Sequence, residues 1–318
     1  MTVAVAIALY NGERFIEDQL ESLRTQTRMP DRVVMCDDGS KDKTVEIIKA
    51  YIQKYELGEK WHLVRNPQNL GYIKNFYSAI SQCEEDLIFL CDQDDIWKAD
   101  KIEKMTQIMM EHEEINLLSS KHGIIDGEGN EIKSIMHKEA AETGGLSPVT
   151  VKDVMRAYRW PGMIMCIRKH FFDSIIDSIE DYAIPHDLAF VICAADQNTF
   201  YEYDYIGAYH RRHNNNTAKE EHRVSKLLSQ KRKIEEIEET LRQLNCIIDA
   251  RLSVKSQTYD IIKYKLEYLV KRKDCLKNGG LKNLIQLYIN DKEKLFRIQA
   301  FVCDVWIVLF DRNKEAVK

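Results

Sequence analysis

Several common motifs are missing from this sequence, and each absence excludes a class of site or protein. The eight cysteines form no CxxC pair, so we expect buried free thiols in a reducing cytoplasm rather than a metal site. No GxxxxGK[ST] phosphate loop occurs, and the GxG at 127–129 is too short for a dinucleotide fingerprint. The longest apolar stretch near the end, 300–310, contains Asp304 and is far shorter than the roughly 20 residues of a membrane-spanning helix. The chain opens directly on a strand-like apolar run at 3–9, so we expect no signal peptide.

Charge is distributed unequally along the chain. Residues 219–318 contain 22 Lys and Arg against 15 Asp and Glu, a net charge of +7, which leaves 24 against 36 and a net of −12 for residues 1–218. Glycine almost disappears from the second part, apart from the pair at 279–280, and its long stretches are charged and amphipathic. We therefore expect an acidic region that suits a metal-dependent enzyme, followed by a basic helical region. The basic helices suit an anionic surface, although solvated helix faces would carry the same charges.

Strand and helix patterns alternate through the first half of the chain. Short apolar runs predict buried strands at 3–9, 32–36, 61–65 and 87–91. Helical spacing of apolar residues predicts helices at 14–25, 40–55, 73–81 and 98–111, and we expect Ser40 to cap the second of these. This alternation predicts an α/β fold of βαβ units with a mostly parallel central sheet. Polar turns follow the strands, and ligands of such sheets bind at the carboxyl ends of the strands, so these turns should converge on one site.

Two carboxylates follow the fourth predicted strand. Asp92 and Asp94 flank Gln93, which places both acids on one side of the chain where the strand ends. Hard oxygen ligands at this position suit Mg²⁺ or Mn²⁺ bridging a nucleotide diphosphate. Such triplets also start turns and cap helices, and Asp95 and Lys98 before a helix fit that alternative.

Four motifs follow one another through the first third of the chain. They are Ala8 to Gly12, the DDGS turn at 37–40, Asn69-Leu70-Gly71 and the DQDDIW stretch at 92–97. In order and spacing they resemble the motifs of the family 2 glycosyltransferases, which have the GT-A fold. The stretch from Asn69 to Phe76, the DQDDIW stretch, His186-Asp187 and the segment from Tyr209 to Asn216 are similar to the bacterial rhamnosyltransferase-like subgroup. The resemblance covers about residues 3–217. It implies a Rossmann-like GT-A catalytic domain over 1–218, followed by a C-terminal α-helical extension over 219–318.

The resemblance also implies roles for individual side chains. Tyr10 would stack on the nucleotide base, Asp94 would ligate the metal and Asp187 would be the catalytic base, while Trp160 and His186 would contact the acceptor. The donor-binding set would comprise Tyr10, Asn11, Asp37, Asp38, Asn69, Lys74, Asp92, Arg211 and His213.

Several of these residues have a structural alternative. Tyr10 fits the edge of a core, Lys74 fits a solvated helix face, and Asp187 fits the N-cap of the helix that follows it. Arg211 and His213 fit a surface loop as well as a site for the diphosphate.

We therefore predict an inverting, metal-dependent glycosyltransferase. It would move a hexose of the rhamnose, galactose or glucose type from a nucleoside diphosphate sugar to a hydroxyl of a cell-surface polysaccharide or other glycan. A base would take the proton of the acceptor hydroxyl. Its partners would be the donor and a glycan or lipid-linked glycan acceptor, with no nucleic acid. The enzyme would be cytoplasmic, and its terminal helices would contact either the inner face of the membrane or a second copy of the chain.

Two other classes remain open from the residues alone. A sugar nucleotidyltransferase would also use carboxylates and a metal, but it usually has a glycine-rich basic loop after the first strand, where this chain has Tyr10-Asn11-Gly12-Glu13. A non-catalytic binding subunit of glycan assembly would be expected to lack the Asp-x-Asp triplet or the base, and both are present.

Overall fold

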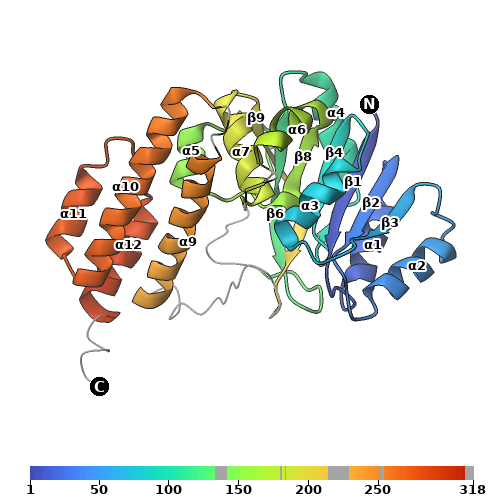
Figure 1. The fold of residues 1–318 in the computed structure, drawn as a ribbon, viewed down its shortest axis with the longest axis horizontal. Coiled ribbons are helices and arrows are strands. Elements are labelled where there is room, and N and C mark those ends of the chain that lie inside the picture. Colours follow the sequence, from blue (N-terminus) through green and yellow to red (C-terminus); the bar gives the residue numbers. More distant parts are fainter. Residues whose placement is uncertain are drawn as a thin grey trace. The chain divides into compact units, whose positions relative to one another are not determined.

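The computed structural model describes residues 1–132, 142–179, 181–182, 184–213, 229–250, 252 and 254–311. A central sheet with its helices comes first in the chain, and a group of helices comes last (Figure 1). The asparagines at 214–216 and the predicted boundary after residue 218 lie outside the described residues.

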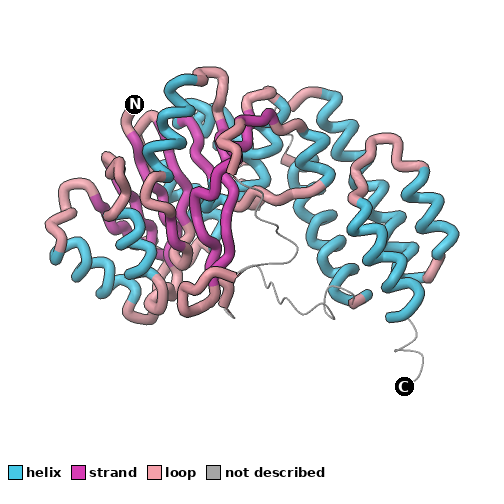
Figure 2. Tube along the Cα trace, turned by 180° about the vertical axis from the view of Figure 1, so that it is seen from behind, coloured by secondary structure: helices cyan, strands magenta, loops and turns pink. Residues whose placement is uncertain are grey.

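The sheet is built on four parallel strands, all of which the apolar runs predict. They lie in the order β3-β2-β1-β4 and comprise β1 (Val3–Leu9), β2 (Arg32–Asp37), β3 (Trp61–Arg65) and β4 (Leu87–Cys91). Every residue of β4, and all but one of β1, is buried, as expected of parallel strands that are covered on both faces. The predicted α/β class with a mostly parallel core is confirmed, and Figure 2 shows the strands as one layer with helices packed against it.

Five further strands, which pair mostly antiparallel, extend this sheet beyond β4. The order continues β8-β6-β9-β5, and β7 also pairs with β9. The bounds are β5 (Ile96–Trp97), β6 (Leu117–Ile125), β7 (Leu146–Pro148), β8 (Met165–Arg168) and β9 (Phe200–Arg211). Strand β9 is parallel to β6 and antiparallel to β5 and β7, so it places its carboxyl end beside the turn that follows β4.

Helices connect the strands, largely where the apolar spacing predicts them. They are α1 (Ile16–Arg24), α2 (Thr44–Lys54), α3 (Tyr72–Ser81), α4 (Lys101–Glu111), α6 (Lys169–Ile175) and α7 (His186–Asp196), with short 3-10 turns at Gly162–Ile164 and Ile176–Ser178. The predicted cap of the second helix is wrong. Helix α2 begins at Thr44 with Lys43 before it, and the Ser40 hydroxyl instead accepts a hydrogen bond from the Asn11 backbone N–H.

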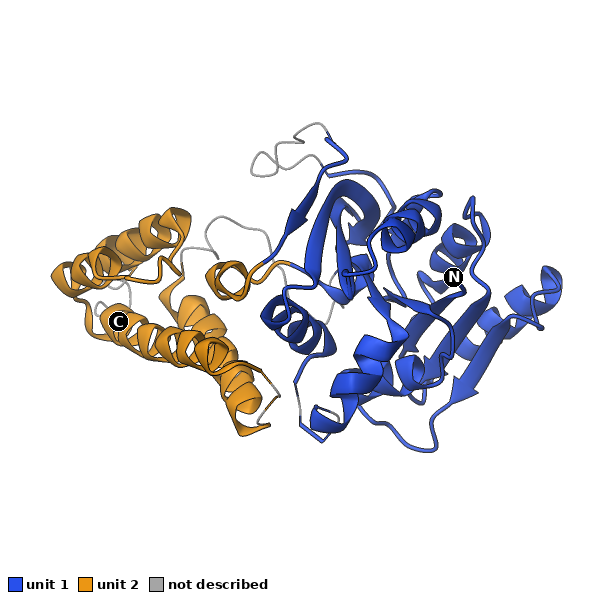
Figure 3. Cartoon of the chain, turned by 90° about the horizontal axis from the view of Figure 1, so that it is seen from above, with its two compact units in different colours: residues 1–149, 160–216 blue, residues 150–159, 217–318 orange. Residues whose placement is uncertain are grey.

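The chain divides into two compact units (Figure 3). Unit 1 is Met1–Val149 with Trp160–Asn216, and unit 2 is Thr150–Arg159 with Thr217–Lys318. Helix α5 (Val151–Arg156) therefore belongs with unit 2, although it lies between strands of unit 1 in the sequence. The assignment of catalysis to residues 1–218 stays a prediction.

Unit 2 is helical in its described part. Besides α5 it contains α9 (Gln230–Asp249), α10 (Ser256–Asn278), α11 (Leu281–Ile289), α12 (Ile298–Trp306) and a π-helical turn, η3 (Ile307–Asp311). Gly279 has a φ of 66°, and this left-handed residue ends α10, as the glycine pair predicts. A search of the described helices found none that is long and apolar enough to cross a membrane.

Candidate active site

The turn after β1 is fastened to the turn after β4 by one side chain. Gln93 Oε1 accepts a hydrogen bond from the Tyr10 backbone N–H at 2.9 Å, and Gln93 Nε2 donates to the Tyr10 carbonyl at 3.0 Å. Gly12 faces the same amide, since a Cβ there would lie 2.5 Å from Gln93 Oε1. The middle residue of the Asp-Gln-Asp triplet thus aligns two motifs. Tyr10 remains 47% exposed, which leaves its ring accessible for stacking on a base.

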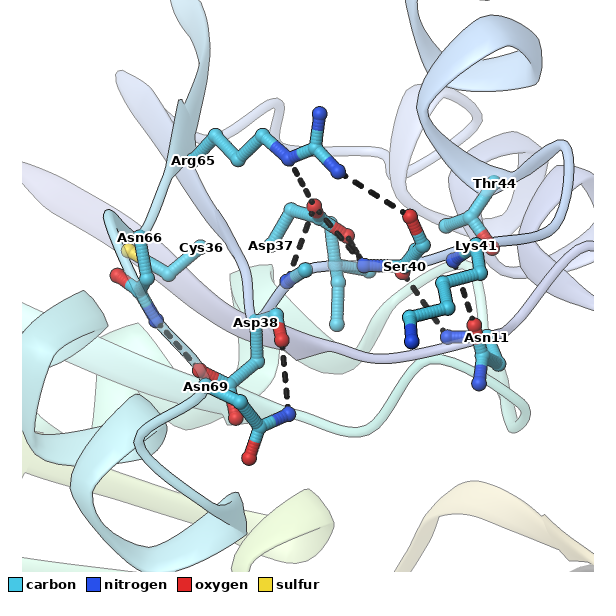
Figure 4. A network of polar contacts seen from close by, with 12 residues as sticks. Asn11, Cys36, Asp37, Asp38, Ser40, Lys41, Thr44, Arg65, Asn66 and Asn69 are labelled. Carbon is cyan, nitrogen blue, oxygen red and sulfur yellow. Dashed lines mark hydrogen bonds and ion pairs between the residues drawn. The ribbon is translucent and has the colours of Figure 1, made fainter.

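The turn after β1 is also fastened to the turn after β2. The Asn11 backbone N–H donates to Ser40 Oγ at 2.9 Å, and the Lys41 backbone N–H donates to Asn11 Oδ1 at 2.9 Å (Figure 4). The Gly12 N–H donates to Thr44 Oγ1 at 2.7 Å. The Asn11 side chain therefore braces the loop in this structure, and its predicted contact with the donor stays a prediction.

Asp37 is buried and organises the DDGS turn. Its carboxylate accepts hydrogen bonds from the backbone N–H groups of Ser40, at 3.2 Å, and Gly39, at 3.3 Å. Arg65 Nε lies 3.3 Å from the same carboxylate, and Arg65 also donates to the Ser40 carbonyl (Figure 4). These contacts fix the shape of the turn. The predicted role of Asp37 in donor binding stays a prediction.

Asp38 joins the same turn to the loop between β3 and α3. Its buried carboxylate accepts hydrogen bonds from Asn66 Nδ2 at 2.9 Å, the Leu70 N–H at 2.7 Å and the Gly71 N–H at 2.8 Å. Asn69 Nδ2 donates to the Asp38 carbonyl at 2.8 Å (Figure 4). The structure therefore brings the predicted Asp38 and Asn69 together as parts of one loop network.

Asn75 completes this network, and the sequence reading gave it no role. Its Oδ1 accepts from Asn66 Nδ2 at 2.8 Å, while its Nδ2 donates to the carbonyls of Cys36 at 3.0 Å and Leu9 at 3.3 Å. This buried amide on α3 thus ties together the carboxyl ends of β1 and β2. A lone amide among the inward positions of an apolar helix is a sequence signal that could have indicated it.

Three carboxylates gather where β4 ends. Burial raises the pKa of Asp92 well above its usual range, and the neighbouring charges of Asp95 and Asp94 raise it further. Burial also raises the pKa of Asp95, although a hydrogen bond from His210 opposes the rise. Asp95 Oδ2 is buried and has no hydrogen-bond partner in the described part of the chain. Charged carboxylates are therefore disfavoured here, and a bound cation would favour their ionised form.

Two histidines from the end of β9 and the segment after it meet these acids. His213 Nε2 lies 2.8 Å from Asp94 Oδ2, and its ring packs against Phe15 at a centroid distance of 4.5 Å. His210 Nδ1 lies 3.2 Å from Asp95 Oδ1. Burial lowers the pKa of His210, but the hydrogen bond and the charge of Asp95 outweigh it and raise that pKa to about 9. The structure thus places the predicted His213 beside the predicted metal ligand, and adds His210, to which the sequence reading gave no role.

Arg211, which lies between the two histidines in the sequence, is buried and supports the turn after β4. Its guanidinium donates to Asp18 Oδ2 at 2.8 Å, to the Gly127 carbonyl at 3.1 Å and to the Asp94 carbonyl at 3.0 Å. Only 1% of its surface is exposed. Arg211 therefore shapes the acidic turn in this structure, and its predicted contact with a diphosphate stays a prediction.

Asp187 is the second residue of α7, so it lies in the first helical turn and not at the cap, where Pro185 precedes the helix. Its Oδ1 accepts from the Leu188 N–H at 2.8 Å, and its charge is one of the causes that raise the pKa of Asp92. The alternative reading of Asp187 as an N-cap is therefore wrong. The predicted role of Asp187 as the catalytic base stays a prediction.

His186 packs in the core beside Asp187. Its ring stacks on Phe76 at a centroid distance of 4.1 Å, and a Cβ on Gly162 would lie 2.6 Å from its Nε2. Both ring nitrogens are buried with no hydrogen-bond partner among the described residues, and burial lowers the pKa of the ring. Tyr77 Oη donates to the Ile184 carbonyl at 3.1 Å, so α3 holds the chain on both sides of Pro185.

The two remaining predicted residues differ in exposure. Trp160 is buried, its Nε1 donates to Glu202 Oε2 at 2.7 Å, and its ring contacts Phe200 edge-on at 5.3 Å. Lys74 is exposed on α3. The acceptor contact of Trp160 and the donor contact of Lys74 stay predictions.

The divalent ion that the sequence implies has no preformed cage of side chains within the described residues. The described residues contain no group of three His, Cys, Asp or Glu side chains placed to hold a metal ion. Mg²⁺ usually takes only one or two carboxylates from the protein and completes its coordination with water and substrate phosphates. The acidic turn after β4, with its unpartnered Asp95 oxygen, fits an ion that binds together with a diphosphate.

Comparison with known proteins agrees with this geometry. The family model described as "Glycosyl transferase family 2" matches residues 4–172. The dTDP-rhamnosyl transferase RfbG of Shigella flexneri is 35% identical over 100 residues, which cover 30% of this chain and 34% of that protein. The chain spans about half the length of the curated relatives it matches, with 42% and 52% covered in two of them.

Solved structures share the fold over nearly the whole chain. TarS 1-349 of S. aureus in complex with UDP has a TM-score of 0.59 and 16% identity, and the match covers 99% of this chain and 92% of that one. The mannosyltransferase PcManGT of Pyrobaculum calidifontis, in complex with GDP-Man and Mn²⁺, has a TM-score of 0.54 and 13% identity, with 98% and 87% covered. The predicted GT-A fold is confirmed. Because the family model spans more than half of the chain, including the turns after β1, β2 and β4, this protein belongs to glycosyl transferase family 2.

Proposed function

We propose that this chain is an inverting glycosyltransferase that moves a hexose from a nucleoside diphosphate sugar to a hydroxyl of a cell-surface glycan. The observation that supports the proposal is that α3 holds both parts of the site. Its Asn75 ties together the turns after β1 and β2, and the next two residues contact His186 and the Ile184 carbonyl at the start of α7, where Asp187 lies. A carboxylate on a helix separate from the acidic turn would let the proton step and the charge step be handled by different groups.

The donor side of the site would be the set of turns that Gln93, Asp38 and Asn75 lock together. These turns lie at the carboxyl ends of parallel strands, where ligands of such sheets bind. The exposed ring of Tyr10 offers a stacking surface for the nucleotide base. Because the loops are already braced by hydrogen bonds, little ordering of the protein would be needed when the donor binds.

The acceptor side would be the amino end of α7. Asp187 would accept the proton of the acceptor hydroxyl while that oxygen attacks the anomeric carbon, the bond from this carbon to the diphosphate oxygen breaks, and the nucleoside diphosphate leaves. His186, stacked on Phe76, holds the start of α7 in place.

Charge on the leaving group is the second task of the site. Asp94 would hold a divalent ion together with the diphosphate oxygens, and such an ion, when bound, neutralises the charge that develops on the leaving phosphate. His213 lies against Asp94, where it would direct the carboxylate. A hexose of the rhamnose, galactose or glucose type is proposed as the transferred sugar, and the rhamnosyl transferase among the relatives supports this range.

The two rival classes have less support. A sugar nucleotidyltransferase would need cationic groups on the loop after β1, whereas the backbone of that loop is occupied by Gln93, Ser40 and Thr44. A non-catalytic subunit gives no reason for the chain to have both an acidic turn after β4 and a separate carboxylate at the start of α7.

A release assay would distinguish these classes. The purified chain would be incubated with UDP-, dTDP- and GDP-sugars, with Mn²⁺ or with excess chelator, and release of the nucleoside diphosphate would be measured. We expect release from one nucleotide class, dependent on Mn²⁺, lost in Asp94→Asn and retained in Asp177→Asn, which removes an exposed carboxylate on the 3-10 turn before α7. Release of pyrophosphate from a nucleoside triphosphate and a sugar phosphate would indicate a nucleotidyltransferase. Donor binding without any release would indicate a binding subunit.

A further inference from the structure

The last helices of unit 2 leave large apolar side chains exposed. Ile285 and Ile289 lie four residues apart on α11, and Ile298 and Val302 lie four apart on α12, so each pair forms a stripe along one side of its helix. Ile289 is the most exposed, at 73%. We define the apolar face as these two stripes with the end of the π-helical turn, which together comprise Ile285, Ile289, Ile298, Val302, Leu309 and Phe310.

This exposure is not a failure of the helices to pack. Tyr288 of α11 stacks on Phe301 of α12 at a ring distance of 4.5 Å, and Phe296 contacts both of these rings and Tyr268. Leu284 is completely buried. The helices therefore have an apolar core of their own, and the apolar face is additional to it.

The exposed charges beside the apolar face are basic. Lys282 lies on α11, Lys292 and Lys294 lie in the loop after it, and Arg297 directly precedes α12. All four side chains are exposed. No ion pair is recorded for any of them within the described residues.

The described acidic side chains of residues 281–311 all form hydrogen bonds or ion pairs within unit 2. Asp304 is buried and accepts two hydrogen bonds from Arg272, and Glu293 lies 2.8 Å from Lys152 Nζ. Asp291 accepts from Tyr264 Oη, and Asp311 accepts from the Gln230 N–H at 2.7 Å. The segment thus presents apolar and basic groups outward while its acids are used internally.

We propose that the apolar face docks this protein on an anionic lipid surface, with Lys282, Lys292, Lys294 and Arg297 among the lipid headgroups. Helices that combine exposed apolar side chains with Lys and Arg lie in the interface between headgroups and acyl chains. Basic residues near an anionic surface add favourable energy for each charge.

Charge also decides between a lipid surface and a second copy of the chain. In a two-fold symmetric dimer the same patch meets itself, so the basic groups of one copy would face those of the other. Such like-charge contacts oppose association, whereas an anionic surface complements the same charges. The proposal does not depend on the transferase activity and survives if that activity is not found.

Vesicle flotation with the full chain tests the proposal. The probes are vesicles of phosphatidylcholine alone and of phosphatidylcholine with phosphatidylglycerol. We expect the chain to float with the anionic vesicles and not with the neutral ones. We also expect binding to fall as salt is raised from about 0.05 M to about 0.5 M, because salt screens charge over a shorter distance.

Two matched pairs of variants locate the surface. Ile289→Ser should weaken partitioning several-fold, whereas Met110→Ser, which removes an exposed apolar side chain from unit 1, should not. Lys282→Gln with Arg297→Gln should weaken it about tenfold or more, whereas Lys49→Gln with Lys60→Gln, two exposed lysines of unit 1, should have much less effect. Circular dichroism checks that each variant is folded. If a variant is not folded, the lipid and salt series on the unchanged chain tests the proposal.

Four results would overturn the proposal. The first is a lack of flotation with anionic vesicles, and the second is equal flotation with neutral ones. The third is binding to anionic vesicles that both the Ile289 and the basic variants leave unchanged. A dimer in light scattering that Ile289→Ser converts to a monomer would also overturn it, because a second copy would then cover the apolar face.

Discussion

Asn75 lies where the networks of three turns meet. In Asn75→Leu the carbonyls of Leu9 and Cys36 would each lose a hydrogen bond, and Asn66 Nδ2 would keep only its bond to Asp38, all in a buried setting. Each buried polar group left unpaired costs about 1–3 kcal/mol. We expect the urea midpoint to fall by an amount that corresponds to at least one such group, together with weaker donor binding.

The control for this prediction is the same substitution at an exposed amide. Asn283→Leu on α11 should change stability by no more than about 0.5 kcal/mol, as is usual at the surface. Equal effects at the two positions would show that the Asn75 network does not support the fold.

Lys101 at the start of α4 is a second buried polar residue with a measurable consequence. Its Nζ donates to the Met163 carbonyl at 2.6 Å and lies 3.3 Å from the ring centre of Trp97. Burial lowers the pKa of Lys101 from 10.5 to about 7, although Cys91 and Asp95 oppose the change. Between about pH 7 and about pH 10 the unfolded chain therefore binds more protons at this residue than the folded chain.

It follows that Lys101 makes stability rise with pH, by up to about 1.4 kcal/mol per pH unit. Lys101→Met should remove this contribution, so the difference in unfolding free energy between the two proteins should change steadily from about pH 7.5 to about pH 8.5. Urea unfolding at each pH measures it. A difference that is constant with pH would mean that Lys101 is not held uncharged in the folded state.

Some residues of the candidate site can be identified from the sequence, and others cannot. The positions of Asp92 and Asp94 after a strand, and of Asp187 in a motif, identify these residues as candidates, and their shared role in one site stays a prediction. The tasks of Gln93 and Asn75 could not be predicted in this way. Their hydrogen bonds join backbone groups from separate turns, and the partners of such bonds are decided by tertiary packing rather than by local pattern.

At the scale of elements, α3 links the two halves of the site. Its buried Asn75 holds the turns on the donor side, while Phe76 and Tyr77 on the next positions contact His186 and the Ile184 carbonyl before α7. A helix shifted by one residue would therefore misplace both the donor turns and the base. This gives α3 a task in the site although none of its described contacts is with Asp187 itself.

A buried ion pair joins α10 to α12 in unit 2. Arg272 Nε lies 2.6 Å from Asp304 Oδ2, and Arg272 Nη2 lies 2.9 Å from Oδ1, with Asp304 fully buried. Asp304→Ala would leave a buried guanidinium without its partner, which costs about 3–5 kcal/mol. We expect faster hydrogen exchange in α12 and an earlier unfolding transition. Asp274→Ala, an exposed carboxylate on α10, should leave both unchanged, and an equal effect would contradict the role given to this pair.

The elements themselves were predictable to different degrees. Long buried runs give the bounds of β1 and β4 almost residue for residue, because a strand covered on both faces must be apolar throughout. Strands β5 and β7 have two and three residues, and both pair with β9, more than fifty residues further along the chain. Such short strands exist only through their partners, so no local pattern indicates them.

At the scale of the whole molecule, the charge asymmetry seen in the sequence corresponds to two kinds of surface. The acidic residues that matter for unit 1 are concentrated at the end of β4, whereas the exposed charges at the end of unit 2 are basic. The sequence predicted this division from charge counts alone. It could not predict that α5 belongs with unit 2, because that assignment depends on contacts between residues far apart in the chain.

The central claim is that Asp187 is the base of a glycosyl transfer. The measurement that tests it most directly is single-turnover transfer to acceptor, together with calorimetric donor binding, in Asp187→Asn and in the control Asp177→Asn. We expect Asp187→Asn to bind the donor within a few-fold of the unchanged protein while transfer falls by about a hundredfold or more, the usual scale for loss of a general base. A normal rate per bound donor, with donor affinity lost instead, would contradict the account and make Asp187 a donor ligand.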